Sequence, residues 1–196
     1  MQMYLALGDS MSIDDYTGVK GGGAVMQFFR TLGDEWKLDD RTFDGCCMSA
    51  VPRNGHGDLI TLTIGGNDLL RNAAKYLSEG LADFAEEHAD LLADLRRKNP
   101  TATLIVGDVY APAIPLGDTE ARRLREANAI IQENCKRFQA QLAPINATFR
   151  SHESTYLCLG IEPALAGARE IARLFEGAFR AASSAAPRKT EKRSWT

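Results

Sequence analysis

The sequence predicts an α/β fold, in which helices cover both faces of a mostly parallel sheet as a three-layer α/β/α sandwich. The first observation is that short apolar, β-branched runs at 4–7, 59–64 and 103–106 alternate with longer segments of helical periodicity. The second is that two of these runs end abruptly in small and polar residues, Gly8-Asp9-Ser10 and Gly65-Gly66-Asn67. Such endings are typical of loops at the carboxyl edge of a parallel sheet, where ligands bind.

Length and composition bound the domain organisation and the partners. The chain has 196 residues, of which 44% are apolar and 25% charged, which suffices for one domain with a substantial core. We expect this domain to span residues 1–182 and the basic segment 183–196 to be a disordered tail. The formal net charge of −3 gives no reason to expect a nucleic acid or an anionic membrane as a partner.

The chain shows no feature of secretion, membrane insertion or metal binding. The amino-terminal residues lead directly into the first predicted strand and lack the basic and apolar regions of a secretion signal. No apolar run is long enough to span a bilayer. The four cysteines lack C-x-x-C spacing and are expected to be reduced thiols in a cytoplasmic protein. No cofactor and no metal are expected, and the sequence leaves the oligomeric state open.

The first third of the chain predicts these elements in order: a strand at 4–7, a polar loop at 11–20, a helix after the glycines at 21–23 that ends near Gly33, a strand at 40–44, a short helix at 46–51 and a strand at 59–64. The spacing of Val25, Phe28 and Leu32 places one apolar face on the first of these helices. The glycines before it lack the Gly-Lys-Ser/Thr ending of a phosphate-binding loop, so we interpret them as a flexible entry to that helix.

The rest of the chain predicts helices at 69–77 and 81–98, a strand at 103–106, a helix from Asp118 or Thr119 to about 142, a short strand at 146–149, an extended segment at 156–159 and a final helix at 163–179. Asn99-Pro100 ends the second of these helices. His88 falls on the apolar stripe of that helix, so it is expected to be a core histidine rather than a catalytic one.

Three segments together resemble the conserved blocks of the SGNH (GDSL) hydrolase family. Tyr4 to Ser12 resembles the first block, Phe43-Asp44-Gly45 the second, and the segment from Leu59 to Asp68 the third. The resemblance implies a flavodoxin-like sheet and cleavage of an ester or acyl group. It also implies that Ser10 is the nucleophile, and that the Ser10 and Gly45 backbone amides and the Asn67 side chain form the oxyanion hole. Taken alone, Gly-Asp-Ser is more typical of a serine cap on the next helix with an aspartate in a turn.

The last block departs from the family pattern. The family has Asp-x-x-His before the final helix, whereas this chain has Leu159-Gly160-Ile161-Glu162-Pro163. Glu162 therefore stands at the histidine position and Leu159 at the aspartate position. Both members of the usual proton-accepting pair are absent, which leaves the base of the reaction open.

Three hypotheses account for this departure. Glu162 could itself be the base, if burial raises its pKa from near 4.3. His152, which lies in a polar segment a few residues earlier, could serve instead, with Glu153 or Glu162 orienting it. In the third hypothesis the pocket is kept but hydrolysis is weak or absent.

The sequence therefore predicts a serine hydrolase that acts on a small-molecule ester or acylated substrate through an acyl intermediate on Ser10. The alternative is a catalytically weak or inactive binding protein of the same fold. Because the family includes enzymes for esters, lipids, thioesters and acetylated sugars, the resemblance does not narrow the substrate further.

Overall fold

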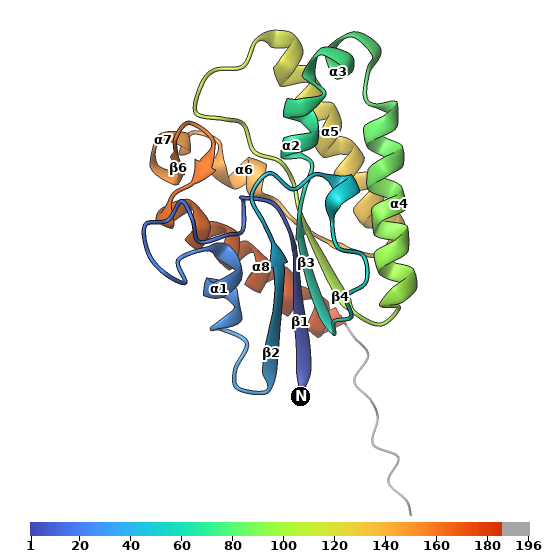
Figure 1. Cartoon of the computed structure of the whole chain (residues 1–196), viewed down its shortest axis with the longest axis vertical. Helices are drawn as coiled ribbons and strands as arrows, with labels where there is room; N and C mark the ends of the chain where they lie inside the picture. Colours follow the sequence, from blue (N-terminus) through green and yellow to red (C-terminus); the bar gives the residue numbers. More distant parts are fainter. Residues whose placement is uncertain (186–196) are drawn as a thin grey trace, which may run out of the picture.

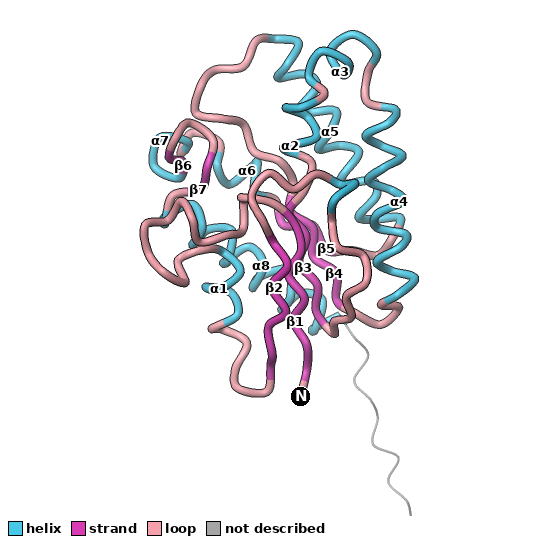
Figure 2. Tube along the Cα trace, viewed as in Figure 1, coloured by secondary structure: helices cyan, strands magenta, loops and turns pink. Residues whose placement is uncertain are grey.

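The central sheet has five parallel strands in the order β2-β1-β3-β4-β5, in a computed structural model that describes residues 1–185 (Figure 2). The strands are β1 (Gln2–Gly8), β2 (Trp36–Thr42), β3 (Leu59–Thr63), β4 (Thr103–Gly107) and β5 (Gln141–Ala143). All four neighbouring pairs in this sheet are parallel. Their carboxyl ends therefore meet at one edge, and the segments that follow β1, β2, β3 and β4 converge there.

Helices cover both faces of the sheet (Figure 1). One face carries α1 (Ala24–Phe29) and α8 (Leu165–Ala185), and the other carries α4 (Ala82–Lys98) and α5 (Asp118–Arg137). The remaining elements lie above the carboxyl edge in Figure 1 and are short: the 3₁₀ turn η1 (Met48–Ala50), α2 (Gly66–Arg71), α3 (Ala73–Glu79), α6 (Ile145–Phe149), α7 (Glu153–Tyr156) and the antiparallel pair β6 (Leu157–Cys158) and β7 (Glu162–Pro163).

Strand β1 shows why the sequence forms three layers. Successive side chains of a strand point to opposite faces. Leu5 and Leu7 accordingly pack with α4 and α5, whereas Tyr4 and Ala6 pack with α1 and α8. Because both faces are covered, the strand is apolar along its whole buried length rather than alternating. The predicted α/β fold is confirmed.

The region after α5 differs from the prediction. The helix expected to run to about 142 ends at Arg137, and 141–143 form the edge strand β5 beside β4. Gln139 has a φ of 54°, a left-handed conformation that turns the chain between the two elements. The strand expected at 146–149 is wrong, because this segment forms α6, whose Ile145 and Phe149 are buried one helical turn apart.

Other boundaries also differ from those expected. Strand β2 begins at Trp36 rather than Asp40, α1 ends at Phe29 before it reaches Gly33, and Asn72 divides the helix expected at 69–77 into α2 and α3. Only 48–50 of the expected helix at 46–51 are helical, as a 3₁₀ turn.

The last helix begins and ends later than expected. Pro163 belongs to β7, so α8 begins at Leu165. It continues to Ala185 and includes Ser183 and Ser184, which were expected to begin the tail. The rest of the expected tail lies outside the described residues.

His88 is a core residue, as its position on the apolar stripe predicts. Its side chain is fully buried, its ring stacks on Phe84, and its Nδ1 lies 3.1 Å from the Asn134 amide nitrogen. Burial lowers the pKa of His88 to about 4, so the ring is neutral at pH 7. Among the described residues, no helix has the length and apolar character that crossing a bilayer requires.

Candidate active site

Ser10 lies immediately beyond the carboxyl end of β1, which is flanked by β2 and β3 in the sheet. Gly8 permits this exit, since its φ is +127° and a Cβ there would lie 2.0 Å from the carbonyl oxygen of Thr63 on the adjacent strand. The amide of Asp9 then donates to that same carbonyl. An oxygen of the Asp9 carboxyl group accepts a hydrogen bond from the amide of Met11, which closes the turn around Ser10. The turn is therefore fixed from both sides of the serine.

Asn67 comes from the neighbouring strand end. After β3, Gly65 has a φ of +109° and is the N-cap of α2, in whose first turn Asn67 lies. The Asn67 amide donates one hydrogen bond to the carbonyl of Cys46, at 3.1 Å. An amide nitrogen carries two hydrogens, so the second remains available to an acceptor in the cleft.

Gly45 follows β2 and reaches the site through its neighbours. Its φ is +70°, and its carbonyl accepts a hydrogen bond of 2.9 Å from the Arg71 guanidinium. The Cys46 carbonyl is the acceptor for Asn67, and the buried Asp68 carboxylate accepts from the Met48 amide. The loop after β2 is thus held against α2. Gly45 itself does not line the cleft above Ser10.

Glu162 is brought to Ser10 by the β6–β7 pair. A cleft of about 60 Å³ is lined by both residues and by Asn67. The tyrosine hydroxyl of Tyr110, which follows β4, donates a hydrogen bond of 2.6 Å to the carbonyl of Ile161. Tyr110 itself is buried and stacks on Phe149 at a centroid distance of 4.8 Å. The position of Glu162 therefore depends on a contact between distant parts of the chain.

Burial raises the pKa of Glu162 above its ordinary value, which the adjacent Ser10 side chain partly opposes and the Asp44 charge reinforces. Its Oε2 is buried without a hydrogen-bond partner among the described residues. A carboxylate in this state is a better proton acceptor than an exposed glutamate, because its protonated form is relatively more stable.

Asp9 is also perturbed. Its side chain is 1% exposed, and burial raises its pKa to about 8, with the hydrogen bond from Met11 opposing the rise. Asp9 is therefore largely neutral at pH 7, which limits the negative charge next to Glu162. Cys46 is no competing nucleophile, since burial raises the pKa of its thiol to about 12.

His152 lies elsewhere. It precedes α7, is exposed, and stacks on Tyr156 with its Nδ1 3.1 Å from the carbonyl oxygen of Arg150. It is not among the residues that line the cleft over Ser10. Leu159, at the position of the family's aspartate, is 81% exposed in the turn between β6 and β7 with a φ of 51°. The structure thus brings Ser10, Asn67 and Glu162 together and leaves His152 and Leu159 outside.

Two residues of the site were missed from the sequence. Tyr110 follows β4 at the same sheet edge as Ser10, so the rule that places ligands at strand ends could have identified it. Arg71 carries no comparable signal, because its contact with Gly45 joins the end of α2 to a loop that is distant in sequence. Within residues 1–185, no group of three or more His, Cys, Asp or Glu side chains converges as a metal site would require.

Comparisons with known proteins agree on one family. The model of the GDSL-like lipase/acylhydrolase family matches residues 6–169. No curated protein sequence matches the chain. Among solved structures, a lipase named Lip_vut3 from a goat rumen metagenome is similar at 19% identity and a TM-score of 0.76, covering 91% of this chain and 97% of its own.

Two further structures are similar over nearly the whole chain. One is a GDSL-like lipase from Parabacteroides merdae, with 15% identity, a TM-score of 0.71, and coverage of 90% of this chain and 94% of its own. The other is the acetylxylan esterase Axe2 from Geobacillus stearothermophilus, with 15% identity, a TM-score of 0.68, and coverage of 89% and 92%. At these identities the likeness concerns the fold.

Proposed function

Because the chain belongs to the GDSL-like lipase/acylhydrolase family, we propose that it hydrolyses an ester or acyl bond of a small molecule, with Ser10 as the nucleophile. The observation that carries the proposal is that one cleft is lined by Ser10, by the amide of Asn67 and by the carboxylate of Glu162. These supply an attacking hydroxyl, a neutral hydrogen-bond donor and a proton acceptor.

In the first half of the reaction, the Ser10 hydroxyl attacks the substrate carbonyl carbon while its proton passes to Glu162. The negative charge that develops on the carbonyl oxygen is stabilised by the Asn67 amide and by the backbone amide of Ser10, both from residues that line the cleft. The family resemblance adds the backbone amide of Gly45, from the loop that is held against α2. As the carbon–oxygen bond of the ester breaks, Glu162 returns the proton to the leaving alcohol. The product is an acyl group on Ser10 and a free alcohol.

In the second half, water takes the place of the alcohol. Glu162 accepts a proton from the water as it attacks the acyl carbon, and the same donors stabilise the oxyanion. The Ser10 oxygen then leaves and recovers a proton from Glu162. The acid is released, and both side chains return to their starting states.

Glu162 is our choice of base, because it borders the same cleft as Ser10, whereas His152 is exposed outside that cleft. An ordinary glutamate is a weak base toward a serine hydroxyl, so its burial and raised pKa matter to the mechanism. In this reading the turn that carries Ile161 and Glu162 replaces the family's histidine block.

A binding protein without turnover is the second candidate. It is favoured by one observation: Leu159 is 81% exposed where the family has the aspartate, so position 159 supplies no carboxylate that could orient Glu162. This candidate predicts stabilisation of the protein by a carbonyl ligand without release of products.

The test is hydrolysis of a chromogenic acetyl ester by wild type, Ser10→Ala, Glu162→Gln and His152→Ala. We expect Ser10→Ala to be inactive and Glu162→Gln to lose about 10²–10⁴ in turnover. His152→Ala should stay within about twofold of wild type, as should the control His56→Ala, which removes an exposed histidine that precedes β3 at the opposite end of the sheet. Labelling with a fluorophosphonate, followed by peptide mass analysis, should place the adduct on Ser10.

Two results contradict the proposal. Equal turnover in wild type and Ser10→Ala at every pH rejects the nucleophile and, with it, hydrolysis by this site. Loss of activity in His152→Ala but not in Glu162→Gln rejects the choice of base and assigns that role to the histidine.

A further inference from the structure

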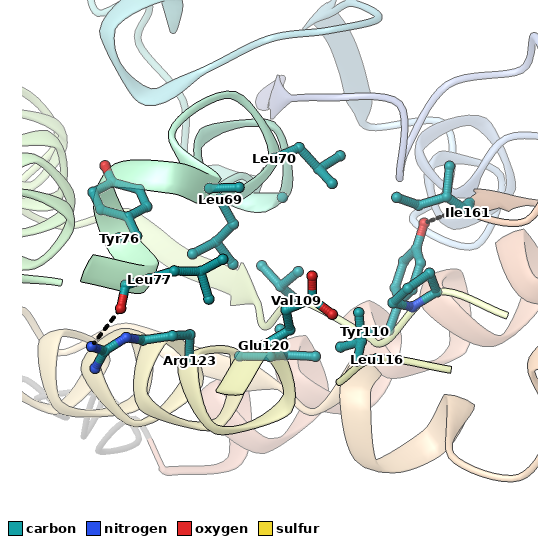
Figure 3. Close-up of a pocket in the computed structure, with 14 residues that line it drawn as sticks. Leu69, Leu70, Tyr76, Leu77, Val109, Tyr110, Leu116, Glu120, Arg123 and Ile161 are labelled. Atoms are coloured by element: carbon teal, nitrogen blue, oxygen red, sulfur yellow. Dashed lines mark hydrogen bonds between the residues drawn. The ribbon is translucent and has the colours of Figure 1, made fainter. Parts of the chain in front are cut away.

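A second, apolar cavity of about 150 Å³ adjoins the cleft over Ser10 (Figure 3). Its walls come from α2, α3, α5, the loop after β4 and the turn before β7. Residues that line both spaces are Gly66, Leu70, Val109, Tyr110 and Ile161. A group that leaves the Ser10 cleft past these residues enters the apolar cavity directly.

The interior of this cavity offers almost no polar group to a ligand. Figure 3 shows Leu69, Leu77 and Val109 gathered around it. Its two charged lining residues make most of their hydrogen bonds within the chain, and only the Nε of Arg123 is buried without a partner among the described residues. Glu120 accepts a hydrogen bond of 2.8 Å from the Gly117 amide, and Arg123 pairs with Glu126 and donates to the carbonyl of Leu77. A sugar, with its many hydroxyls, would find few partners here, whereas an aliphatic chain would lose water-exposed surface.

The mouth of the cavity is apolar as well. Leu70 lines both spaces and is 60% exposed. Ile114, in the loop between β4 and α5, is 71% exposed and lies next to Gly160, but it lines neither space. An aliphatic ligand that extends from the cleft into the cavity would cover the exposed side chain of Leu70.

The polar groups that interact with Glu162 do not belong to the apolar cavity. The charge of Asp44 raises the pKa of Glu162, the charge of Glu162 in turn raises the pKa of Tyr16, and neither Asp44 nor Tyr16 lines that cavity. The leaving alcohol must remain beside Glu162 to receive its proton, so it faces these polar groups. The acyl group then extends toward α3 and α5.

We propose that the apolar cavity binds the acyl chain of the substrate, and that the substrate class is esters of aliphatic acids longer than acetate. This inference rests on the proposed function. Burial of each methylene contributes about 0.8 kcal/mol, which corresponds to about a fourfold rise in kcat/KM per carbon until the cavity is filled.

Two adjacent alanines of α3 provide a matched pair of variants. Ala73 and Ala74 are both exposed, but only Ala73 lines the cavity. For p-nitrophenyl esters from acetate to decanoate, kcat/KM should rise with the length of the acyl chain in wild type and in Ala74→Phe. In Ala73→Phe the added ring occupies the cavity, so the ratio of octanoyl to acetyl ester turnover should fall at least about tenfold. A series of alkyl acetates, in which only the alcohol lengthens, should show no such rise.

Calorimetric binding of octanamide and acetamide separates this inference from the hydrolysis itself. Octanamide should bind wild type, Ser10→Ala and Ala74→Phe more tightly than acetamide does, and Ala73→Phe should lose that difference. If an active wild-type enzyme shows no preference for longer acyl groups and no tighter binding of octanamide, the inference is overturned while the proposed function stands. A preference that follows the alcohol rather than the acyl chain also overturns it. If no ester is cleaved although octanamide binding depends on Ala73 as expected, the proposed function fails and the cavity remains an aliphatic-chain site.

Discussion

The hydroxyl of Tyr110 donates a hydrogen bond of 2.6 Å to the carbonyl oxygen of Ile161, the residue that precedes Glu162. Tyr110 follows β4, at the edge of the sheet where Ser10 also lies, and Ile161 belongs to the turn between β6 and β7. The contact ties the segment that carries Glu162 to the rigid sheet. Because both residues also line the two cavities, this single hydrogen bond links the proposed base to the proposed acyl site.

Tyr110→Phe should lower kcat more than it changes KM. Loss of the hydroxyl leaves the partly buried carbonyl of Ile161 without this donor, which typically costs about 1 kcal/mol of the free energy of unfolding. It also lets Glu162 move relative to Ser10, and a displacement of about 1 Å can reduce the rate 10²-fold. The measurements are steady-state kinetics and urea unfolding.

Tyr156→Phe is the control for this substitution, since Tyr156 also packs on Phe149 but does not contact Ile161 through its hydroxyl. Its kinetics should stay close to those of wild type. Equal losses of kcat in the two variants would show that aromatic packing, rather than the hydrogen bond, is responsible.

Arg71 is expected to position Gly45 for the oxyanion. Its guanidinium donates to the carbonyl of Gly45, the residue whose amide the proposed mechanism assigns to the oxyanion hole. Arg71→Ala should lower kcat between about tenfold and 10²-fold with little change in KM, because the interaction matters most as charge develops on the oxyanion. Arg71→Lys should recover part of the loss.

Stability separates this role from a structural one. Arg71 is exposed, so its removal should change the free energy of unfolding by less than about 0.5 kcal/mol. Arg97→Ala, which removes an exposed arginine of α4 paired with Asp94, should leave kinetics unaltered. A large loss of stability in Arg71→Ala, in proportion to its loss of rate, would contradict the positioning role.

The pH dependence of hydrolysis should follow the ionisation of Glu162. The base must be deprotonated, so kcat/KM should rise with pH through the Glu162 pKa, which burial raises above 4.5, and then level off. An unperturbed histidine would instead produce a rise near pH 6.5. The measurement is the profile of kcat/KM from pH 4 to 8 for wild type and His152→Ala, and the two curves should coincide. A shift of the rise in His152→Ala would point to the histidine.

Asp9 should make the protein less stable as pH rises. Its pKa is raised from 3.8 to about 8 in the folded protein, so the folded state binds more protons than the unfolded state between these values. The free energy of unfolding therefore falls with rising pH across that interval. Urea unfolding midpoints from pH 5 to 9 should decline in wild type and decline less in Asp9→Asn.

Asp94→Asn provides the comparison with the opposite sign. Its ion pairs with Lys98 and Arg97 lower the Asp94 pKa, so its contribution to stability is lost only as the pH falls below the ordinary range of an aspartate. Between pH 5 and 9 the urea unfolding midpoints of Asp94→Asn should change with pH in parallel with those of wild type. A decline in Asp9→Asn as steep as in wild type would exclude Asp9 as the cause.

Local patterns in the sequence suffice for much of the fold. The apolar runs that became β1, β3 and β4 are nearly continuous because both faces of these strands are buried, and such runs are visible without any tertiary information. The weaker predictions failed where local propensity competes with packing. The segment 146–149 has no strong preference for helix or strand. In the folded protein it forms a helix, in which Phe149 is buried against Tyr110, rather than the expected strand.

By itself, the sequence determined the layered fold and the meeting of Ser10, Asn67 and the Gly45 loop at one edge, since parallel strands place the residues that follow them on the same side of the sheet. Only the tertiary structure decided that Glu162, and not His152, borders the cleft over Ser10. Both residues lie in short segments near the end of the domain, with no long strand to fix their direction. Their positions depend on contacts with distant residues, such as the hydrogen bond from Tyr110 to Ile161, and spacing along the chain does not encode such contacts.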